Sequence, residues 1–171
     1  NNIIAYLRST YQTVISSDGY EADDEMGIFQ VDALRRGVDT TIASRDKDLR
    51  IIPGNHYSWE CGKQLAIGPH QTDDFGSLEK VDGKTLGYGK LFFYHQMLTG
   101  DSVDNIPGLR GCGDVAAHNI LEGADSEKDV YNRVKAAYKE KMGDAAKEYF
   151  LEQANLLWIA QERGKRYEFP R

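Results

Sequence analysis

The stretch Ala22–Ile52, ADDEMGIFQVDALRRGVDTTIASRDKDLRII, largely determines the expected fold. Apolar side chains recur at helical spacing from Ala22 to Arg36, and Gly37 is suited to end this helix because glycine adopts a left-handed backbone easily. The run Asp39–Ser44 is typical of a buried strand, and Leu49–Ile52 is a second short apolar segment. A β-favouring run, Thr13-Val14-Ile15, precedes the helix. Strand, helix and strand in succession predict a parallel α/β sheet.

The flanking segments complete the expected α/β part. Residues Ile3–Thr10 are compatible with a helix, and Thr13-Val14-Ile15 is a β-favouring run that ends at the turn-like Ser16–Gly19. Beyond the central stretch, Tyr57–Trp59 and Gln64–Ile67 are candidate strands of a hairpin.

The second half of the chain is expected to be helical. Amphipathic patterns predict four helices, at Lys90–Leu98, Ala116–Leu121, Ser126–Lys141 and Asp144–Gln161. We therefore expect an α/β portion over residues 1–98 and a helical portion over residues 99–171.

Composition narrows the class of protein. The chain has 171 residues, of which 40% are hydrophobic and 28% charged, enough for one good core. It has no apolar run of 18 residues and no signal-peptide pattern, which predicts a soluble intracellular protein. Cys61 and Cys112 are expected to be reduced thiols, because neither lies at zinc-ligand spacing. The net charge of −6 argues against a general nucleic-acid coat protein.

Acidic residues recur where elements begin or end. Three carboxylates stand at the start of the first long helix, where the alternative is that Asp23 and Asp24 only cap the helix and Glu21 is solvated. Two more follow the Ile42-Ala43 strand, and a third group lies ahead of the glycine-rich segment. A strand–helix–strand unit would bring the first two groups to one sheet edge. The seven residues are Glu21, Asp23, Asp24, Asp46, Asp48, Asp101 and Asp104.

Seven carboxylates in one cleft would repel each other severely unless cations were bound. Oxygen ligands favour Mg²⁺, with Mn²⁺ as a substitute, over zinc. Two such ions can clamp a scissile phosphate between them. The sequence therefore predicts a two-metal phosphoryl-transfer site.

The segment Leu109–Ile120 has the pattern of a helix-hairpin-helix. Gly111 and Gly113 would let the backbone turn tightly beside a phosphate, while Ala117 allows close helix packing. Such a hairpin holds the DNA backbone without choosing a sequence. A simple turn between packed helices is the plainer alternative.

Three motifs carry a resemblance to a known family. They are Tyr20-Glu21-Ala22-Asp23-Asp24, Ser44-Arg45-Asp46-Lys47-Asp48-Leu49 and Thr99-Gly100-Asp101-Ser102-Val103-Asp104-Asn105-Ile106-Pro107-Gly108. In this order, and with the glycine hairpin, they resemble phage 5′-3′ exonucleases and the 5′-nuclease domain of bacterial DNA polymerases. The resemblance implies a PIN-like or Rossmann-like nuclease core followed by a helix-two-turn-helix region.

The resemblance also implies roles for individual residues. Glu21, Asp23 and Asp46 would bind the first metal with Asp24 beside it, whereas Asp48, Asp101 and Asp104 would serve the second. Catalysis would rest on Glu21, Asp23, Asp24, Asp46 and Asp48. Duplex DNA would be held by Gly108, Leu109, Arg110, Gly111, Cys112 and Gly113. A potassium ion, bound in several relatives, would lie at the loop carrying Val103 and Ile106.

The sequence departs from the family in two respects. Val115 stands where many relatives have a lysine, so one phosphate contact is in doubt. The chain begins with Asn1, and nothing before Glu21 supplies the further aspartates and basic arch of the family. We therefore expect a piece of a longer protein. Arg8 is either a remnant of the arch or a solvated side chain.

Other candidates have balanced alternatives. Basic residues could line a DNA track, and Tyr57 or Trp59 could stack on an unpaired base, but solvated and core roles are equally compatible. No histidine has a carboxylate or cysteine at useful sequence spacing, so none is assigned to catalysis. The basic candidates are Lys63, Lys80, Lys84, Lys90 and Arg110, and the histidines are His56, His70, His95 and His118.

The expected function is a structure-specific 5′ nuclease that hydrolyses DNA at 5′ ends or flaps during replication, repair or genome processing. The competing hypothesis is a DNA- and metal-binding module that needs a separate N-terminal portion for activity. A nuclease that acts on RNA is a third possibility, because the hairpin would contact backbone and not bases.

Overall fold

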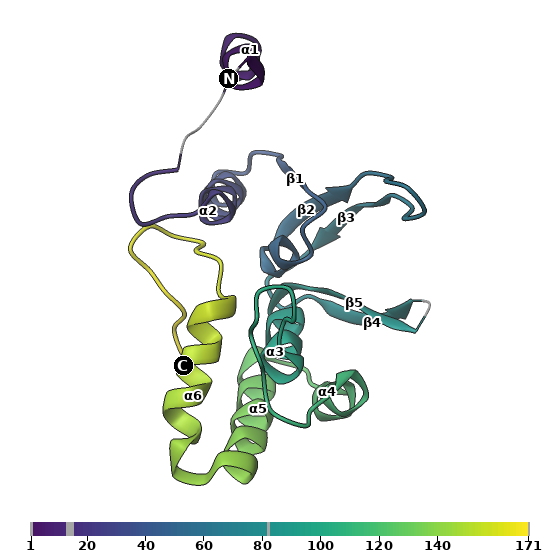
Figure 1. Ribbon diagram of the computed structural model, residues 1–171, viewed down its shortest axis with the longest axis vertical. Coiled ribbons are helices and arrows are strands. Elements are labelled where there is room, and N and C mark those ends of the chain that lie inside the picture. The colour runs from purple at the N-terminus through teal and green to yellow at the C-terminus, as the bar shows by residue number, and fades with distance from the viewer. Residues whose placement is uncertain (1, 13–15, 82, 171) are drawn as a thin grey trace.

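The computed structural model describes residues 2–12, 16–81 and 83–170 of the chain (Figure 1). The expected strand at Thr13-Val14-Ile15 lies outside these residues. The described elements are, in chain order, α1 (Asn2–Thr10), α2 (Ala22–Arg35), β1 (Thr41–Ala43), η1 (Asp48–Ile51), β2 (Gly54–Ser58), β3 (Ile67–Thr72), β4 (Ser77–Val81), β5 (Lys84–Tyr88), α3 (Gly89–Thr99), α4 (Asp114–Leu121), α5 (Glu127–Met142), η2 (Gly143–Ala145) and α6 (Ala146–Leu157).

The fold is a mixed α/β arrangement with a small, partly parallel sheet. Strand β1 pairs with β2 in parallel, with Ile42 opposite His56, and β2 pairs with β3 in antiparallel register. Helix α2 begins and ends close to its predicted bounds, and Gly37 has a φ of 67°, as the capping argument expects. The predicted α/β class is thus confirmed, with a sheet that is parallel only in part.

The short apolar segment Leu49–Ile52 does not have a strand conformation. It forms the short 3₁₀-helix η1, and the second strand begins only at Gly54. The reason is local: the Asp46 side chain accepts a hydrogen bond from the Asp48 N–H at 2.9 Å and turns the chain into a helical bend. The apolar residues of the segment are buried in either conformation, so hydrophobicity could not distinguish them.

Two hairpins follow the parallel pair. The first, β2–β3, was expected, but its strands lie further from the tip than predicted. Strand β2 ends at Ser58, and β3 begins only at Ile67, the last residue of the expected strand, and ends at Thr72. The Cys61–Gln64 bridge lies at the tip. The second, β4–β5, was not predicted. Its strands are half-exposed and carry charged residues, so they lack the alternation of apolar side chains that marks a strand.

The four predicted helices of the second half are confirmed, with small shifts at their ends. Helix α3 lies at the centre of Figure 1 and is buried along most of its length, with Phe93, Tyr94, Met97 and Leu98 fully enclosed. Helices α5 and α6 pack against it, and the Tyr138 hydroxyl donates to the Met97 carbonyl at 2.5 Å. One hydrophobic cluster includes residues on both sides of residue 98. The expected division of the chain at that residue stays a prediction.

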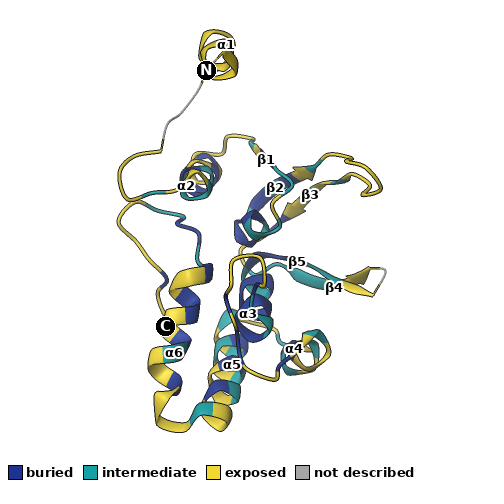
Figure 2. Ribbon diagram, in the orientation of Figure 1, coloured by how far each residue is buried: buried dark blue, intermediate teal, exposed yellow. Residues whose placement is uncertain are grey.

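Helix α1 differs from the other helices in its surroundings. Every one of its residues is exposed in Figure 2, including Ile3, Ile4, Tyr6 and Leu7. None of the helices in the described part of the chain combines the length and apolarity needed to cross a bilayer.

A closed loop after α3 brings two backbone segments into direct contact. Gly100 and Gly108 have φ values of 72° and 61°, and a Cβ on Gly108 would lie 2.2 Å from the Gly100 nitrogen. Between them, Asp101 and Ile106 exchange two backbone hydrogen bonds of 2.8 and 2.7 Å. Only glycine fits at the two ends of this loop.

We predict that Gly108→Ala destabilises the protein by about 2–4 kcal/mol, because it adds a steric clash to the cost of a left-handed backbone. Gly111→Ala is the matched control: Gly111 has a φ of 78° but open space around its Cβ position. It should cost only about 1 kcal/mol. Chemical denaturation of both variants measures the difference, and equal losses would contradict the backbone contact.

Candidate metal centre

The acids of the second motif lie where β1 ends. Asp46 follows the strand and is fixed by a turn: its N–H donates to the Ser44 hydroxyl at 3.0 Å, and its carboxylate accepts from the Asp48 N–H. Asp46 is exposed, whereas Asp48 is half-buried at the start of η1. The turn therefore presents two carboxylates at the carboxyl end of a parallel strand.

The acids of the third motif lie on the closed loop after α3. Asp101 is only 4% exposed, and its carboxylate accepts from the Val103 N–H at 2.8 Å. Asp104 is exposed on the same loop. One carboxylate oxygen from each of Asp48, Asp101 and Asp104 lies within 4.8 Å of the other two. Acids separated by more than 50 residues thus converge.

Two neighbouring side chains hold this cluster together. The Lys47 ammonium contacts Asp48 at 2.8 Å and also contacts Asp101. Gln96 of α3 is 3% exposed, and its amide nitrogen donates to Asp48 Oδ1. Burial opposes the charge of both partners, but their mutual contact raises the pKa of Lys47 and holds that of Asp101 below its ordinary value.

The acids of the first motif begin α2. Burial raises the pKa of Asp23 above its ordinary value, and the negative charges of Asp46, Glu21, Asp24 and Asp48 raise it further. These charges are therefore close enough to interact. The charge of Asp48 contributes to the raised pKa of Asp23, and a carboxylate oxygen of Asp48 lies within 4.8 Å of oxygens of Asp101 and Asp104.

Asp24 also has a structural role. Its carboxylate accepts from the Glu21 N–H at 3.1 Å and from the Ala160 N–H at 2.8 Å. The first of these bonds is the capping contact considered as an alternative from the sequence. The second ties the start of α2 to the C-terminal segment, so both oxygens of Asp24 have partners within the chain.

A divalent metal ion fits the residues present. The donors are hard carboxylate oxygens, which Mg²⁺ and Mn²⁺ prefer, and Asp48, Asp101 and Asp104 are close enough to share one ion. Gln96 supplies a further observation: its side-chain oxygen is buried and has no hydrogen-bond partner among the described residues. Buried acceptors normally have a hydrogen-bond donor. A water molecule bound to a cation in the acidic cluster would be a suitable donor for this oxygen.

The glycine hairpin joins the closed loop to α4. Its residues divide into two kinds. Leu109 and Cys112 are buried and pack in the core, and the Gly108 N–H is taken by Gln153 at 2.9 Å. Arg110, Gly111 and Gly113 are exposed, and no hydrogen bond from their N–H groups is found in the described part of the chain.

The predicted potassium loop is placed as follows. Val103 is 85% exposed, whereas Ile106 is buried and its carbonyl accepts from the Asp101 N–H. Asn105 lies between them with a φ of 57°, a left-handed conformation that asparagine tolerates.

The other basic and aromatic candidates are either paired with acids elsewhere in the chain or exposed. Lys90 is paired with Asp74 and Glu127, at 2.6 and 2.7 Å, so its ammonium links α3 to neighbouring parts of the fold. Lys80 contacts Asp114 and thereby ties β4 to the first turn of α4. The remaining candidates are exposed: Arg8, Lys63, Lys84, Tyr57 and Trp59.

The histidines include one correction. His95 was expected to lack a carboxylate partner, but its Nε2 lies 3.0 Å from Asp114, which is 19 residues away. The contact arises from the packing of α3 against α4, which no local spacing reveals. His56 contacts the Ile52 carbonyl at 2.7 Å, and His70 stacks on Tyr88. Cys61 and Cys112 are free, as expected.

Sequence reasoning missed Lys47 and Gln96 as members of the site. Gln96 was detectable in principle, because it is a polar residue inside the apolar run of α3. Glu25 was missed as well: it is 5% exposed and pairs with Arg163 at 2.6 Å, which holds its pKa below the ordinary value. Nothing local to residue 25 indicates a partner 138 positions away.

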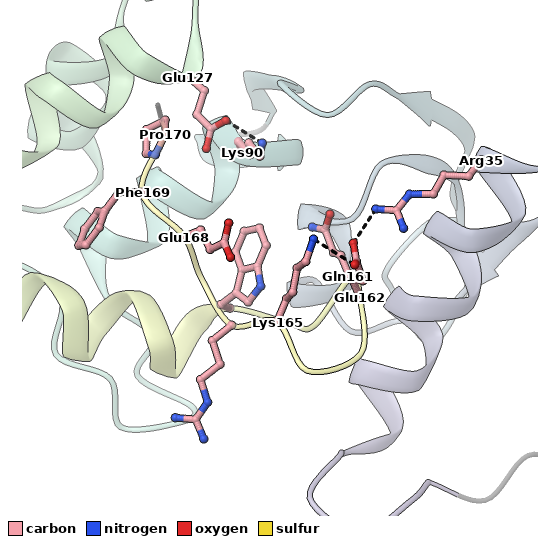
Figure 3. A pocket seen from close by; sticks show the side chains of 11 residues that line it. Arg35, Lys90, Glu127, Gln161, Glu162, Lys165, Glu168, Phe169 and Pro170 are labelled. Carbon is pink, nitrogen blue, oxygen red and sulfur yellow. Dashed lines mark hydrogen bonds and ion pairs between the residues drawn. The ribbon is translucent and has the colours of Figure 1, made fainter.

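A separate pocket of about 280 Å³ lies where the C-terminal segment passes α2 and α3 (Figure 3). Arg35 and Lys165 both pair with Glu162 at 3.0 Å, and Lys90 pairs with Glu127. These ion pairs join the walls of the pocket to one another. The pocket therefore marks an anchorage of the C-terminal segment.

The fold and the cluster define a mixed α/β protein with a carboxylate site consistent with divalent-metal binding. Over 117 residues the chain is 32% identical to the 5′-3′ exonuclease of Buchnera aphidicola subsp. Schizaphis graminum, covering 68% of this chain and 38% of that protein. It is 31% identical to the 5′-3′ exonuclease of Aquifex aeolicus over 112 residues, 66% of this chain and 36% of that one. By this homology the chain belongs to the 5′ nuclease family.

A multidomain relative matches a similar portion of the chain. The DNA polymerase I of Caldicellulosiruptor bescii is 29% identical over 134 residues, which cover 75% of this chain and 15% of the polymerase. The chain thus corresponds to well under half the length of each of these relatives. No family model matches the chain, and no solved structure matches it significantly.

We predict that Asp101→Asn lowers the metal-free stability by roughly 1–3 kcal/mol, because it weakens charge-assisted bonds to Lys47 and the Val103 N–H. Asp104→Asn is the matched control, since Asp104 is exposed and is not among the partners of Lys47. It should change stability by no more than about 0.5 kcal/mol. Urea denaturation in the presence of a chelator makes the comparison. Equal effects would mean that burial of Asp101 carries no energetic weight.

Proposed function

We propose that this chain forms the carboxylate-bearing and duplex-holding part of a metal-dependent 5′ nuclease that hydrolyses DNA at 5′ ends or flaps. The observation that carries the proposal is the convergence of Asp48, Asp101 and Asp104 within 4.8 Å in a chain homologous to 5′-3′ exonucleases. A PIN-like core over residues 1–98 and a helix-hairpin-helix region over residues 99–171 are part of this proposal.

The acids would hold two divalent ions. Glu21, Asp23 and Asp46, with Asp24 at their side, would serve the first site, and Asp48, Asp101 and Asp104 the second. Bound Mg²⁺ would supply a water nucleophile of lowered pKa and stabilise charge on the departing oxygen. Mn²⁺ would substitute, because it accepts the same oxygen ligands.

The chain's own residues orient these acids. Gln96 fixes one oxygen of Asp48, and the Val103 N–H fixes one of Asp101. Each carboxylate is therefore held in a set rotamer before metal and substrate arrive. Fixed orientation of charge is the main contribution that a protein makes to phosphoryl transfer.

The glycine hairpin would hold duplex DNA by its backbone. The exposed N–H groups of Gly111 and Gly113 and the first turn of α4 are suited to a phosphate oxygen. Arg110 adds a positive charge at the same place. Asp114 contributes a negative charge to that turn, but Lys80 contacts it and offsets the charge.

A potassium ion at the loop carrying Val103 and Ile106 would complete the duplex contact. The loop is closed at both ends by the Gly100–Gly108 approach, which fixes its backbone. Backbone carbonyls of this loop would hold the ion, which would supply positive charge for a DNA phosphate.

The competing function is a module that binds DNA and metal but needs further residues for cleavage. The share of the relatives that this chain spans, 36–38% for two 5′-3′ exonucleases, favours testing it directly. The two functions differ in one result, which is whether this chain alone cleaves.

We predict Mg²⁺-dependent cleavage of a 5′-flap DNA by this chain, abolished in Asp46→Ala. A gel shift in Ca²⁺, with the same DNA, measures binding separately. Binding without cleavage would assign this chain to the competing function, and absence of both would refute the proposal. A matched RNA flap tests whether the nuclease discriminates between DNA and RNA.

We further predict that Arg110→Gln weakens duplex binding in Ca²⁺ about three- to tenfold and reduces the salt dependence by about one phosphate contact. Arg36→Gln is the control, because this substitution removes the same charge from an exposed position outside the hairpin. There Arg36 pairs with Asp32 on α2. If both variants lose binding equally, the hairpin is not the DNA contact.

A further inference from the structure

Lys47 occupies an unusual position within the acidic cluster. Its ammonium contacts Asp48 at 2.8 Å and also contacts Asp101, so it lies against two of the three acids whose oxygens converge. A single positive charge supplied by the chain thus sits beside the place proposed for a metal ion. We propose that Lys47 is a built-in competitor of that ion: its ammonium binds the Asp48 and Asp101 carboxylates in the metal-free protein and leaves them when the divalent cation binds. This inference rests on the proposed metal site.

The position of Lys47 follows from the local chain. Its backbone is helical, with φ −69° and ψ −26°, and stands between the Asp46 turn and η1. The Asp46 carboxylate and Ser44 hydroxyl fix that turn through the N–H groups of Asp48 and Asp46. The backbone is therefore anchored, and exchange of partners needs movement of the side chain alone.

The Lys47 side chain is free enough to move. It is 44% exposed, whereas the Asp101 side chain that it contacts is 3% exposed. Four methylene groups link its ammonium to the backbone, which lets the charge swing into solvent without disturbing the core. The acids stay in place during such an exchange, because the Val103 N–H and Gln96 hold them independently.

The two cations cannot share the same oxygens equally well. A carboxylate oxygen that accepts from an ammonium has one of its lone pairs occupied, and a hard divalent ion needs direct coordination by those oxygens. Two positive centres close together would also repel each other. Metal binding must therefore overcome the Lys47 contacts, which lowers the apparent affinity of the site. In return, the cluster keeps a counter-ion when metal is scarce.

The test compares Lys47→Gln with Lys47→Arg in Mn²⁺ titrations followed by electron paramagnetic resonance of the free ion. The binding step of interest is the one lost in Asp101→Asn. We expect Lys47→Gln to bind Mn²⁺ at this step about two- to fivefold more tightly, the range for loss of a partly exposed ion pair. Lys47→Arg keeps the charge and should stay nearer to the parent protein. Lys63→Gln, an exposed lysine at the hairpin tip, should bind as the parent does.

Stability without metal provides the second readout. With a chelator present, Lys47→Gln should unfold at lower urea than the parent, and added Mn²⁺ should restore more stability to the variant than to the parent. If the variant is unfolded without metal, Mn²⁺ should refold it, which also supports the competition. A variant that stays unfolded in Mn²⁺ would overturn it.

The outcomes separate this inference from the metal site on which it rests. Equal or weaker Mn²⁺ binding by Lys47→Gln, with normal binding by the parent, overturns the role of Lys47 and leaves the metal site intact. Binding by the variant but not by the parent supports the competition. Absence of binding by both proteins refutes the metal site, and the inference falls with it.

Discussion

The rest of the site depends on the contact between Gly100 and Gly108. Because a backbone nitrogen of one glycine lies where a side chain of the other would be, the chain returns on itself within nine residues of the end of α3. This closure points Asp101 toward η1 and places Asp104 beside it. Gly108 is also the residue from which the chain enters the glycine hairpin that leads to α4. One steric constraint therefore fixes both the acidic cluster and the start of the glycine hairpin.

Electrostatic repulsion is the cost of this arrangement, and the molecule offsets it in several ways. Asp23 shows this repulsion most clearly, since burial raises its pKa and the negative charges of its neighbours raise it further. Elsewhere the chain supplies its own donors: Lys47 and Gln96 for Asp48, and the Val103 N–H for Asp101. The acids are thus arranged at separations that favour a cation over the bare cluster. A cation that binds between these carboxylates relieves their mutual repulsion, and this relief contributes to its affinity.

The sequence predicted what is local and missed what is distant. The spans of α2 and of the later helices follow from periodicity, because each buries one face. Strand β1 was expected as a buried strand over Asp39–Ser44, but it covers Thr41–Ala43 and only Ile42 is buried. The placement of the first two groups of acids at one sheet edge stays a prediction, because the strand expected before α2 lies outside the described residues. The conformation of η1 could not be predicted, because burial of Leu49 and Ile51 looks the same in a strand and in a 3₁₀-helix. The contacts His95–Asp114, Gln96–Asp48 and Glu25–Arg163 depend on packing between separate elements, which no spacing encodes.

The C-terminal segment beyond α6 returns to the start of α2 and bonds there repeatedly (Figure 1). Ala160 donates to Asp24, Arg163 to Glu25, and the Gly164 N–H to the Tyr20 hydroxyl, across 136, 138 and 144 residues. Contacts of such sequence separation close large loops and tend to form late in folding. Part of what orients the first acidic motif is therefore supplied from the opposite end of the sequence. The geometry of these acids thus depends on the folding of the whole chain and not on their local segment alone.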